Sequence, residues 1–206
     1  MKRLLLVGAS GHGRVVADLA ELLGWDSIAF VDDRWPEITF NRQWPVIGTI
    51  KDLARLRGEY ETAFVSIGAN KARLTLHRKI TELSFTVPML VHPSAVVSRY
   101  AGLGRGAVAL ANVVVSSFAV VGEAVVLNTA CTVDHDCVLG DGIHISPGAH
   151  LAGNVIVGDC SWVGIGASVR EGTVIGSDSM IGAGSAVVSD IRAGATAIGV
   201  PARPRN

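Results

Sequence analysis

The sequence has little of what a secreted, membrane-spanning or nucleic-acid-binding protein needs. Its three cysteines are an odd number and include no closely spaced pair of the kind that binds a metal. They indicate a protein without a disulfide framework, from a reducing compartment, the cytoplasm. No apolar run approaches the roughly 18 residues of a membrane span, and Leu4–Val7 is too short for the core of a signal peptide. The 18 basic residues balance 18 acidic ones, so we expect no nucleic-acid or anionic-membrane partner.

Charge and glycine are unevenly distributed along the 206 residues. Residues 1–90 hold 22 of the 36 charged residues and 7 of the 24 glycines, whereas residues 91–190 hold 11 and 15 of them. The composition changes near Pro88–Pro93. We therefore predict two small domains, residues 1–88 and residues 89–206.

Strand and helix patterns alternate in the first domain. Apolar runs that end at glycine or acidic turns indicate strands, and helical apolar periodicity lies between them. We expect strands at 3–7, 28–31, 63–67 and 87–91, and helices at 13–23, 50–56 and 70–83. In the first helix, one face should bury Val15, Val16, Leu19, Leu22 and Leu23. This alternation predicts an α/β domain with a parallel sheet wound in the Rossmann manner, too short for a full dinucleotide fold.

A six-residue period runs through the second domain. Counted in sixes from Val91 to Val187, sixteen of seventeen positions are Val, Leu or Ile. This period fits neither a helix nor an ordinary strand pair, but it fits a hexapeptide β-helix, in which three hexads form one coil of a triangular prism. We expect about five coils of 18 residues, with the large aliphatic residues pointing inward.

Small residues follow the same period. A second series, four residues after the first, is small or β-branched and includes Cys131 and Cys137, which we interpret as buried packing thiols. Glycines often come directly after the first series, and we expect them to supply positive φ in the turns. They are Gly104, Gly122, Gly140, Gly158, Gly164, Gly176 and Gly182.

The turn between the first strand and the first helix is a candidate phosphate site. Its residues Gly8–Gly13 include Ser10, Gly11, His12 and Gly13, and Ser10 stands where a dinucleotide motif has its second glycine. Backbone N–H groups at such a turn can bind a diphosphate, although a tight turn without a ligand is the alternative.

Polar residues follow the second and third strands. Asp32, with Asp33 beside it, lies where a carboxylate can accept a ribose hydroxyl, and Gly68-Ala69-Asn70 ends the third strand. Arg73 could approach phosphates or be a solvated helix charge. Together with the first turn, Asp32, Asp33, Gly68 and Asn70 predict a nucleotide site.

The second domain has a candidate base in the turn Asp134-His135-Asp136. A neighbouring carboxylate can fix the tautomer of an imidazole and raise its basicity. Gly153 lies 18 residues later, one coil above His135, where a backbone N–H could polarise an acyl carbonyl. The alternatives are a polar turn residue and a zinc site formed by His135, Asp136 and His144. His77 and His92 suggest only a surface or linker position.

The chain resembles the sugar-modifying acetyltransferases that join an N-terminal Rossmann-like domain to a C-terminal left-handed β-helix. It is most similar to the UDP-4-amino-sugar N-acetyltransferases of the bacillosamine pathway, with sialic acid O-acetyltransferases and GDP-perosamine N-acetyltransferases as relatives. The resemblance covers essentially the whole chain. The matching stretches are Val7–Gly13, Phe30–Asp33, Leu127–Thr129, Val133–Cys137, His144–Ala149, Ala152–Asn154 and Gly199–Arg203.

This resemblance implies an enzyme and assigns its residues. It implies that His135 is the general base, that Asp136 orients it and that the Gly153 N–H polarises the acetyl group. It implies that acetyl-CoA, the co-substrate, lies near His144, Ala152 and Gly153, between two β-helices of a homotrimer, with no metal involved. The sugar nucleotide is expected at Ser10–Gly13, Asp32 and the Gly68–Asn70 turn, where Ala69 replaces an asparagine that relatives often carry.

We therefore expect acetyl transfer from acetyl-CoA to the 4-amino group of a UDP-linked deoxy-sugar. The alternatives are O-acetylation of sialic acid or another sugar hydroxyl, and N-acetylation of a GDP-linked amino sugar. Two alternatives from other classes are a non-catalytic nucleotide-binding scaffold and a metal protein similar to γ-carbonic anhydrases.

Overall fold

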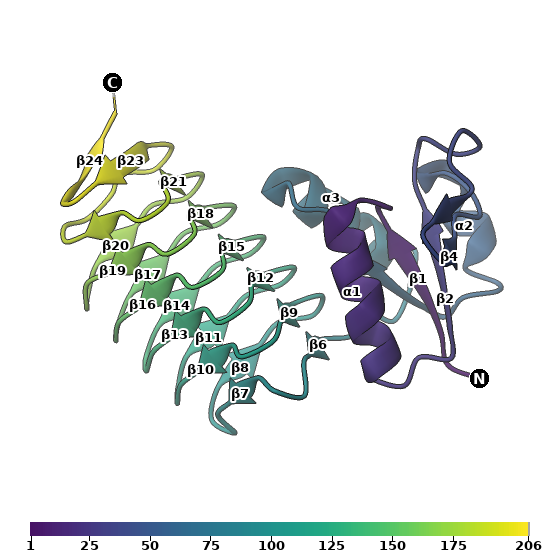
Figure 1. The fold of residues 1–206 in the computed structure, drawn as a ribbon, viewed down its shortest axis with the longest axis horizontal. Helices are drawn as coiled ribbons and strands as arrows, with labels where there is room; N and C mark the ends of the chain where they lie inside the picture. The colour runs from purple at the N-terminus through teal and green to yellow at the C-terminus, as the bar shows by residue number, and fades with distance from the viewer. Residues whose placement is uncertain (206) are drawn as a thin grey trace. The chain divides into compact units, whose positions relative to one another are not determined.

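The computed structural model describes residues 1–205, which form two compact units, Met1–Leu90 and the chain from Val91 onward (Figure 1). The predicted domain boundary, after residue 88, lies two residues before this division. The first unit combines a sheet with helices, and the second is a stack of short parallel strands.

A three-stranded parallel sheet forms the centre of the first unit. β1 (Arg3–Val7) lies between β2 (Ser27–Val31) and β5 (Thr62–Val65), and the four last residues of β1 are buried. The chain passes from β1 to β2 on one side and then crosses to β5 on the other. In such sheets, ligands bind in the crevice at the carboxyl ends of the strands where the direction of winding changes. Here the loops after Val7 and Val65 occupy that position.

Helices α1 (Gly11–Leu22) and α3 (Asn70–Glu82) follow β1 and β5. In α1, Val16 and Leu19 are buried as predicted, but Val15 and Leu22 are exposed. The buried face of α1 is therefore shifted from the predicted one, because Ala17 and Ala20 are buried in place of Val15 and Leu22. Gly24, just after the C-cap residue Leu23, has φ +76°, the left-handed conformation that commonly ends a helix.

The remaining elements of the first unit are short. They are β3 (Phe40–Asn41), β4 (Trp44–Pro45), a 3₁₀ turn η1 (Ile50–Asp52) and α2 (Leu53–Leu56). The antiparallel pair β3–β4 was not anticipated. Of the fourth strand predicted at 87–91, only the last two residues form a strand, and it lies outside the three-stranded sheet. Only Thr86 bridges to Thr62, and the chain then forms β6 (Leu90–Val91), which pairs within the solenoid. Among residues 1–205, no helix has the length and apolar content needed to cross a membrane.

The second unit is a parallel β-solenoid with a triangular cross-section. Its three sheets contain six, five and eight strands, which gives about six turns where we expected about five. Strands pair with the strand 18 residues later, as Thr132 pairs with His150 and His150 with Ser168. After β6 the two-residue strands are β7 (Val96–Val97), β8 (Gly102–Leu103), β9 (Val108–Ala109), β10 (Val114–Val115), β11 (Val120–Val121), β12 (Val126–Leu127), β13 (Thr132–Val133), β14 (Val138–Leu139), β15 (His144–Ile145), β16 (His150–Leu151), β17 (Ile156–Val157), β18 (Trp162–Val163), β19 (Ser168–Val169), β20 (Val174–Ile175), β21 (Met180–Ile181) and β22 (Ala186–Val187). The longer β23 (Thr196–Gly199) and β24 (Ala202–Pro204) complete the eight-stranded sheet.

The core of the solenoid follows the predicted series. The second residue of most strands points inward and is buried, as Val133, Leu151 and Val169 are. Cys131 and Cys137 are buried in the small series, as expected for packing thiols, and burial raises the pKa of Cys131 to about 12. Apolar burial of this regular kind is the main favourable contribution to folding.

The glycines that follow the inward series have a different role from the one predicted. None of them has positive φ; instead, a Cβ at each would lie within 2.6 Å of an atom of the next coil. They are glycines because successive coils approach closely at the corners. Positive φ occurs two residues later in the turn, at glycines such as Gly106 and Gly142 and at non-glycines such as Asp136 and Asn154.

Candidate active site

The loop after β1 is hydrogen-bonded to a residue that follows the neighbouring strand β5. Gly8 has φ +103°, and Ser66 at the end of β5 donates its hydroxyl to the carbonyl oxygen of Gly8 at 2.8 Å. A Cβ at Gly13 would lie 2.5 Å from the same carbonyl oxygen. Helix α1 therefore starts in close contact with the strand end because residues 8 and 13 lack side chains.

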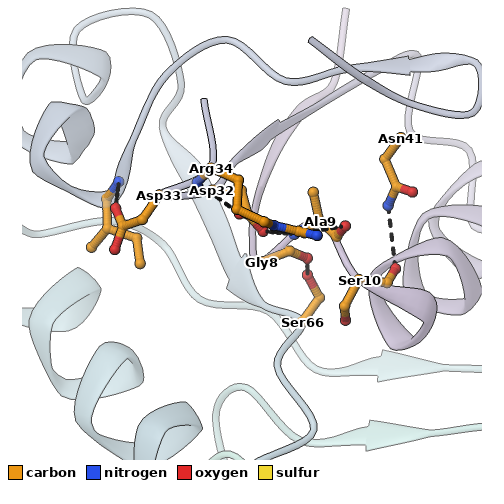
Figure 2. A network of polar contacts seen from close by, with 9 residues as sticks. Gly8, Ala9, Ser10, Asp32, Asp33, Arg34, Asn41 and Ser66 are labelled. Carbon is orange, nitrogen blue, oxygen red and sulfur yellow. Dashed lines mark hydrogen bonds and ion pairs between the residues drawn. The ribbon is translucent and has the colours of Figure 1, made fainter. Parts of the chain in front are cut away.

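The first turn of α1 has unsatisfied donors. The first N–H groups of a helix have no intrahelical acceptor, Ser10 makes no side-chain cap bond, and the turn contains no acidic residue. These donors and the helix dipole favour an anion. Arg14, in the same turn, is exposed and lies 3.4 Å from Asn41 Oδ1, while Asn41 donates to the Ser10 carbonyl oxygen at 3.3 Å (Figure 2).

Asp32 is engaged by the loop and by Arg34. Its carboxylate accepts the Ala9 N–H at 2.8 Å, and Arg34 donates to it through Nε at 2.8 Å and Nη2 at 3.0 Å (Figure 2). The Arg34 side chain lowers the pKa of Asp32 to about 2, and the Ala9 N–H contributes. Arg34 also donates to the Ala9 carbonyl oxygen at 2.9 Å. Asp32, predicted to accept a ribose hydroxyl, is thus already hydrogen-bonded to the loop, and the Arg34 side chain partly covers its carboxylate.

Two other predicted nucleotide contacts have partners within the first unit. Asp33 accepts the Ile50 N–H at 3.0 Å. Asn70 accepts from Arg73 Nη2 at 2.9 Å, and Arg73 also donates to the Gly68 carbonyl oxygen at 2.8 Å. Arg73 is only 1% exposed, so it is a buried clamp on this turn rather than a solvated charge.

Two histidines of the first unit are more buried than their sequence context suggested. Burial, assisted by the positive charge of Arg73, lowers the pKa of His12 to about 4. His12 therefore carries no charge at neutral pH and can act only as a neutral hydrogen-bonding group beside the loop. His77, expected at the surface or in a linker, is buried in α3.

In the solenoid, an imidazole–carboxylate pair lies at one corner. His135 Nδ1 is 2.8 Å from Asp136 Oδ2, and both side chains are 51% exposed. The hydrogen bond to Asp136 is the largest cause of a raised His135 pKa, with smaller contributions from Asp134 and Glu171. Because Asp136 accepts the Nδ1 proton, Nε2 keeps its lone pair and can accept a proton.

Gly153 lies directly against this imidazole. A Cβ at position 153 would lie 2.5 Å from Cε1 and 2.6 Å from Nε2 of His135. One coil below, the Asp134 side chain accepts the His135 N–H at 2.8 Å. In the coil of Gly153, Ala152 occupies the position of Asp134, and its methyl side chain cannot accept a hydrogen bond. The Gly153 N–H is thus available to a carbonyl oxygen beside the base.

His144 lies on another side of the prism, in β15. It stacks on Trp162 at 4.6 Å between ring centroids, and Trp162 donates to Ser146 Oγ at 2.7 Å. Asn128 Oδ1 accepts the Thr129 N–H, so its Nδ2 faces His144 Nε2 at 3.1 Å and donates to it. The proton of a neutral His144 is therefore on Nδ1.

The predicted residues thus fall into three groups: those around the loop after β1 in the first unit, those at one corner of the solenoid, and His144. His135, Asp136, Ala152 and Gly153 meet at one corner, whereas His144 does not join them within a single chain. Among residues 1–205, no three histidine, cysteine or acidic side chains are close enough together to bind a metal. Asp134, which accepts the His135 N–H, could have been identified from the sequence, because it stands next to His135 in the turn Asp134-His135-Asp136. Arg34 follows Asp32 closely, but nothing in the sequence marked Ser66 or Asn41.

An imidazole–carboxylate pair beside a backbone N–H, at the corner of a hexapeptide solenoid, supplies the groups that acyl transfer needs. Comparison with known proteins agrees. Residues 3–80 match the family described as the PglD N-terminal domain. The curated UDP-N-acetylbacillosamine N-acetyltransferase of Bacillus subtilis (strain 168) is 34% identical over 114 residues. That match spans 54% of this chain and about half (52%) of the relative.

Solved structures match over the whole chain. The acetyltransferase domain of PglB from Neisseria gonorrhoeae FA1090, in complex with acetyl coenzyme A, is 43% identical, with 99% of both chains covered and a TM-score of 0.95. PerB from Caulobacter crescentus, in complex with CoA and GDP-perosamine, is 36% identical, with a TM-score of 0.94, over 100% of this chain and 98% of that one. The chain belongs to the family of sugar-nucleotide N-acetyltransferases.

Proposed function

We propose that the protein transfers the acetyl group of acetyl-CoA to the 4-amino group of a UDP-linked deoxy-sugar. The observation that carries this proposal is the corner of the solenoid, where the imidazole of His135, paired with Asp136, lies directly against Gly153. The relatives named for N-acetyl transfer and for acetyl-CoA complexes support the reaction class.

In the proposed reaction, the amine nitrogen attacks the thioester carbonyl carbon. The nitrogen becomes cationic, and His135 Nε2 removes its proton while Asp136 stabilises the resulting imidazolium. The Gly153 N–H donates to the developing oxyanion. The carbon–sulfur bond then breaks, and the proton on His135 can pass to the departing CoA thiolate. No residue at this corner is placed to form a covalent acetyl-enzyme.

We infer that the first unit is a Rossmann-like domain that binds the nucleotide. The strand order β2-β1-β5, the loop at the change of winding and the unsatisfied N–H groups of α1 support a diphosphate there. The predicted contacts are those of Ser10–Gly13 and the Gly68–Asn70 turn, with Asp32 and Asp33 beside them. A UDP-linked acceptor follows the bacillosamine relative; the GDP-perosamine complex of PerB makes a GDP-linked sugar the second candidate.

We further propose that the protein is a homotrimer. Acetyl-CoA contacts were expected at His144 and at Gly153. Gly153 lies at the corner between the six- and five-stranded sheets, whereas His144 lies on the eight-stranded sheet. A site that uses both therefore needs two chains. Light scattering that found a fully active 21.5 kDa monomer would contradict this assembly.

The reaction is tested with UDP- and GDP-linked 4-amino sugars, acetyl-CoA and detection of the free thiol. We expect turnover with a UDP-linked 4-amino sugar and none with its 4-hydroxyl counterpart or with sialic acid. Turnover with hydroxyl acceptors alone would identify an O-acetyltransferase. Nucleotide binding without thiol release from any acceptor would identify a scaffold.

A further inference from the structure

Two exposed aromatic rings lie at the corner of the solenoid that carries His135 and Asp136. Tyr100 and Phe118 stack on each other, with ring centroids 5.5 Å apart and an angle of 22° between the ring planes. The strands beside this corner pair at intervals of 18 residues, so Phe118 and Tyr100 lie one and two coils below Asp136, in the same position of the turn. Tyr100 is 63% exposed and Phe118 is 60% exposed. This aromatic pair therefore presents an apolar surface within one coil of the proposed base.

The backbone at Phe118 has a conformation that a large side chain seldom adopts. Its φ is +62°, in the left-handed region that glycine, asparagine and aspartate tolerate best. Between residues 91 and 205, the other non-glycine residues with positive φ have small or short polar side chains: Asn112, Ala124, Ala130, Asp136, Asn154, Cys160 and Asp178. Phe118 suits neither the turn, where asparagine would fit better, nor the core, from which its ring projects. An exposed ring held in an unfavourable conformation points to a binding role.

The proposed reaction brings the two substrates to His135 from different sides. The Gly153 N–H, which is proposed to bind the acetyl oxygen, belongs to the coil above the imidazole. Above the imidazole–carboxylate pair, the turn position of the aromatic pair is occupied by Asn154 and Gly172, which offer no apolar side chain. The acceptor amine has to reach the carbonyl carbon from a side that the acetyl oxygen does not occupy. The apolar surface available to the rest of the acceptor is therefore the aromatic pair in the coils below.

The chemistry of a deoxy-sugar suits an aromatic surface. A pyranose ring presents C–H groups on its faces, and a 6-deoxy sugar has a methyl group where other sugars carry a hydroxymethyl group. Burial of such groups against an aromatic ring is favourable, whereas a hydroxyl placed there loses its hydrogen bonds to water. Successive coils lie roughly 4.8 Å apart, which is close to the width of a pyranose ring. A sugar whose 4-amino group reaches His135 Nε2 can therefore lie with its ring over Phe118.

We propose that Tyr100 and Phe118 form the platform for the sugar ring of the acceptor and select a 6-deoxy sugar. Phe118 contacts the C–H groups and the methyl group, and Tyr100 supports the Phe118 ring from the coil below. This inference rests on the proposed function and deepens it. The proposed base determines where the amine lies, and the aromatic pair determines which sugar is accepted.

Phe118→Asn tests the platform, because asparagine removes the ring and tolerates the same φ. We expect the thermal midpoint of this variant to equal or exceed that of wild type. Its KM for a UDP-linked 4-amino-4,6-dideoxy sugar should rise about tenfold or more, while kcat and the KM for acetyl-CoA stay within about twofold. Its preference for this sugar over the counterpart with a 6-hydroxyl group should fall by a similar factor. Phe118→Tyr, which keeps the ring, should behave like wild type.

Val96→Thr is the matched control. Val96 is an exposed apolar residue in the same coil as Tyr100, but it lies on the outer face of the six-stranded sheet, and its substitution should leave both KM values unchanged. An active wild type whose acceptor KM and sugar preference survive Phe118→Asn would overturn the inference and leave the proposed function intact. A lower mass in light scattering with an unchanged acceptor KM would make the aromatic pair a contact between copies of the chain instead. A wild type that acetylates no amino sugar would overturn both.

Discussion

The imidazole of His135 occupies the space that a side chain at position 153 would need. A Cβ there would lie 2.5 Å from Cε1 of the ring, closer than two carbon atoms can approach. Glycine at 153 therefore permits the ring to lie against the next coil, and no side chain at 153 covers the neighbouring N–H. The proposed base and the proposed oxyanion donor depend on the same missing side chain.

Gly153→Ala should displace the imidazole without unfolding the protein. The His135 side chain is half-exposed and can rotate away, so the thermal midpoint should change little. Misplacing the base and crowding the donor should lower kcat by about 10²-fold or more. Gly102→Ala is the matched control, because a Cβ at position 102 has open space around it. Wild-type kcat in a folded Gly153→Ala variant would mean that His135 is not the base.

The pH dependence of the reaction should report on His135. In the proposed reaction the neutral ring is the active form. Because Asp136 raises the pKa of His135, kcat/KM should rise with pH through a group above the ordinary value near 6.5. His135→Ala should lower kcat by roughly 10²–10⁴-fold and remove this rising limb of the pH profile. Asp136→Asn should cost less activity and move the limb to lower pH, because the bond that favours the protonated ring is lost.

A control histidine distinguishes titration of the base from titration elsewhere. His150 is exposed and only 3.0 Å from the Thr132 hydroxyl, on a strand of the same coil as Gly153. His150→Ala should keep both the limb and the rate. Persistence of the limb in His135→Ala would instead assign it to the acceptor amine.

The solenoid could be predicted because its order is periodic. The six-residue repeat fixes which residues point inward, and the 18-residue coil places Gly153 over His135 without any long-range information. The reason for the glycines after the inward series could not be obtained in the same way. Their constraint is an atom of the next coil, as when a Cβ at Gly164 would lie 2.5 Å from the Ile181 carbonyl oxygen.

The loop site of the first unit was less predictable. The turn after β1 was identified from its glycines, but its supports come from distant parts of the chain. Ser66 reaches Gly8 from 58 residues away, and Asn41 reaches Ser10 from 31 residues away. Arg73 carried no sign that it would be buried. A single sequence indicates local periodicity, whereas these contacts depend on how non-adjacent strands come together.

Two glycines of this loop should behave differently when substituted. A Cβ at Gly13 would lie 2.5 Å from the Gly8 carbonyl oxygen, and backbone cannot move aside, so Gly13→Ala should destabilise the protein by about 1–3 kcal/mol. A Cβ at Gly11 has only the mobile end of Arg14 within 4 Å. Gly11→Val should therefore fold normally but hinder the approach of a phosphate to the backbone.

For Gly11→Val we expect the KM for the acceptor to rise at least about tenfold, while the KM for acetyl-CoA stays within about twofold. Thermal unfolding of both variants separates the folding effect from the binding effect. Equal changes in the two KM values for Gly11→Val would show that the loop is not a dedicated acceptor site.

The Asp32–Arg34 pair should make the stability of the first unit depend on pH in a defined window. The folded pKa of Asp32 is about 2, below its ordinary 3.8, so the stabilisation is fully present above pH 4–5 and is lost as the pH falls through about 2. Solvent screens this partly exposed pair, which limits its contribution to about 1–2 kcal/mol. Arg34→Ala should lower the thermal midpoint at pH 7 and at pH 5, and the difference from wild type should shrink as the pH falls to about 2 and disappear below it, where Asp32 is protonated in both proteins. Arg78→Ala, which removes an exposed arginine on α3, should track wild type at every pH. A constant difference for Arg34→Ala down to pH 2 would mean that Arg34 stabilises the loop through its bond to the Ala9 carbonyl oxygen rather than through the charge of Asp32.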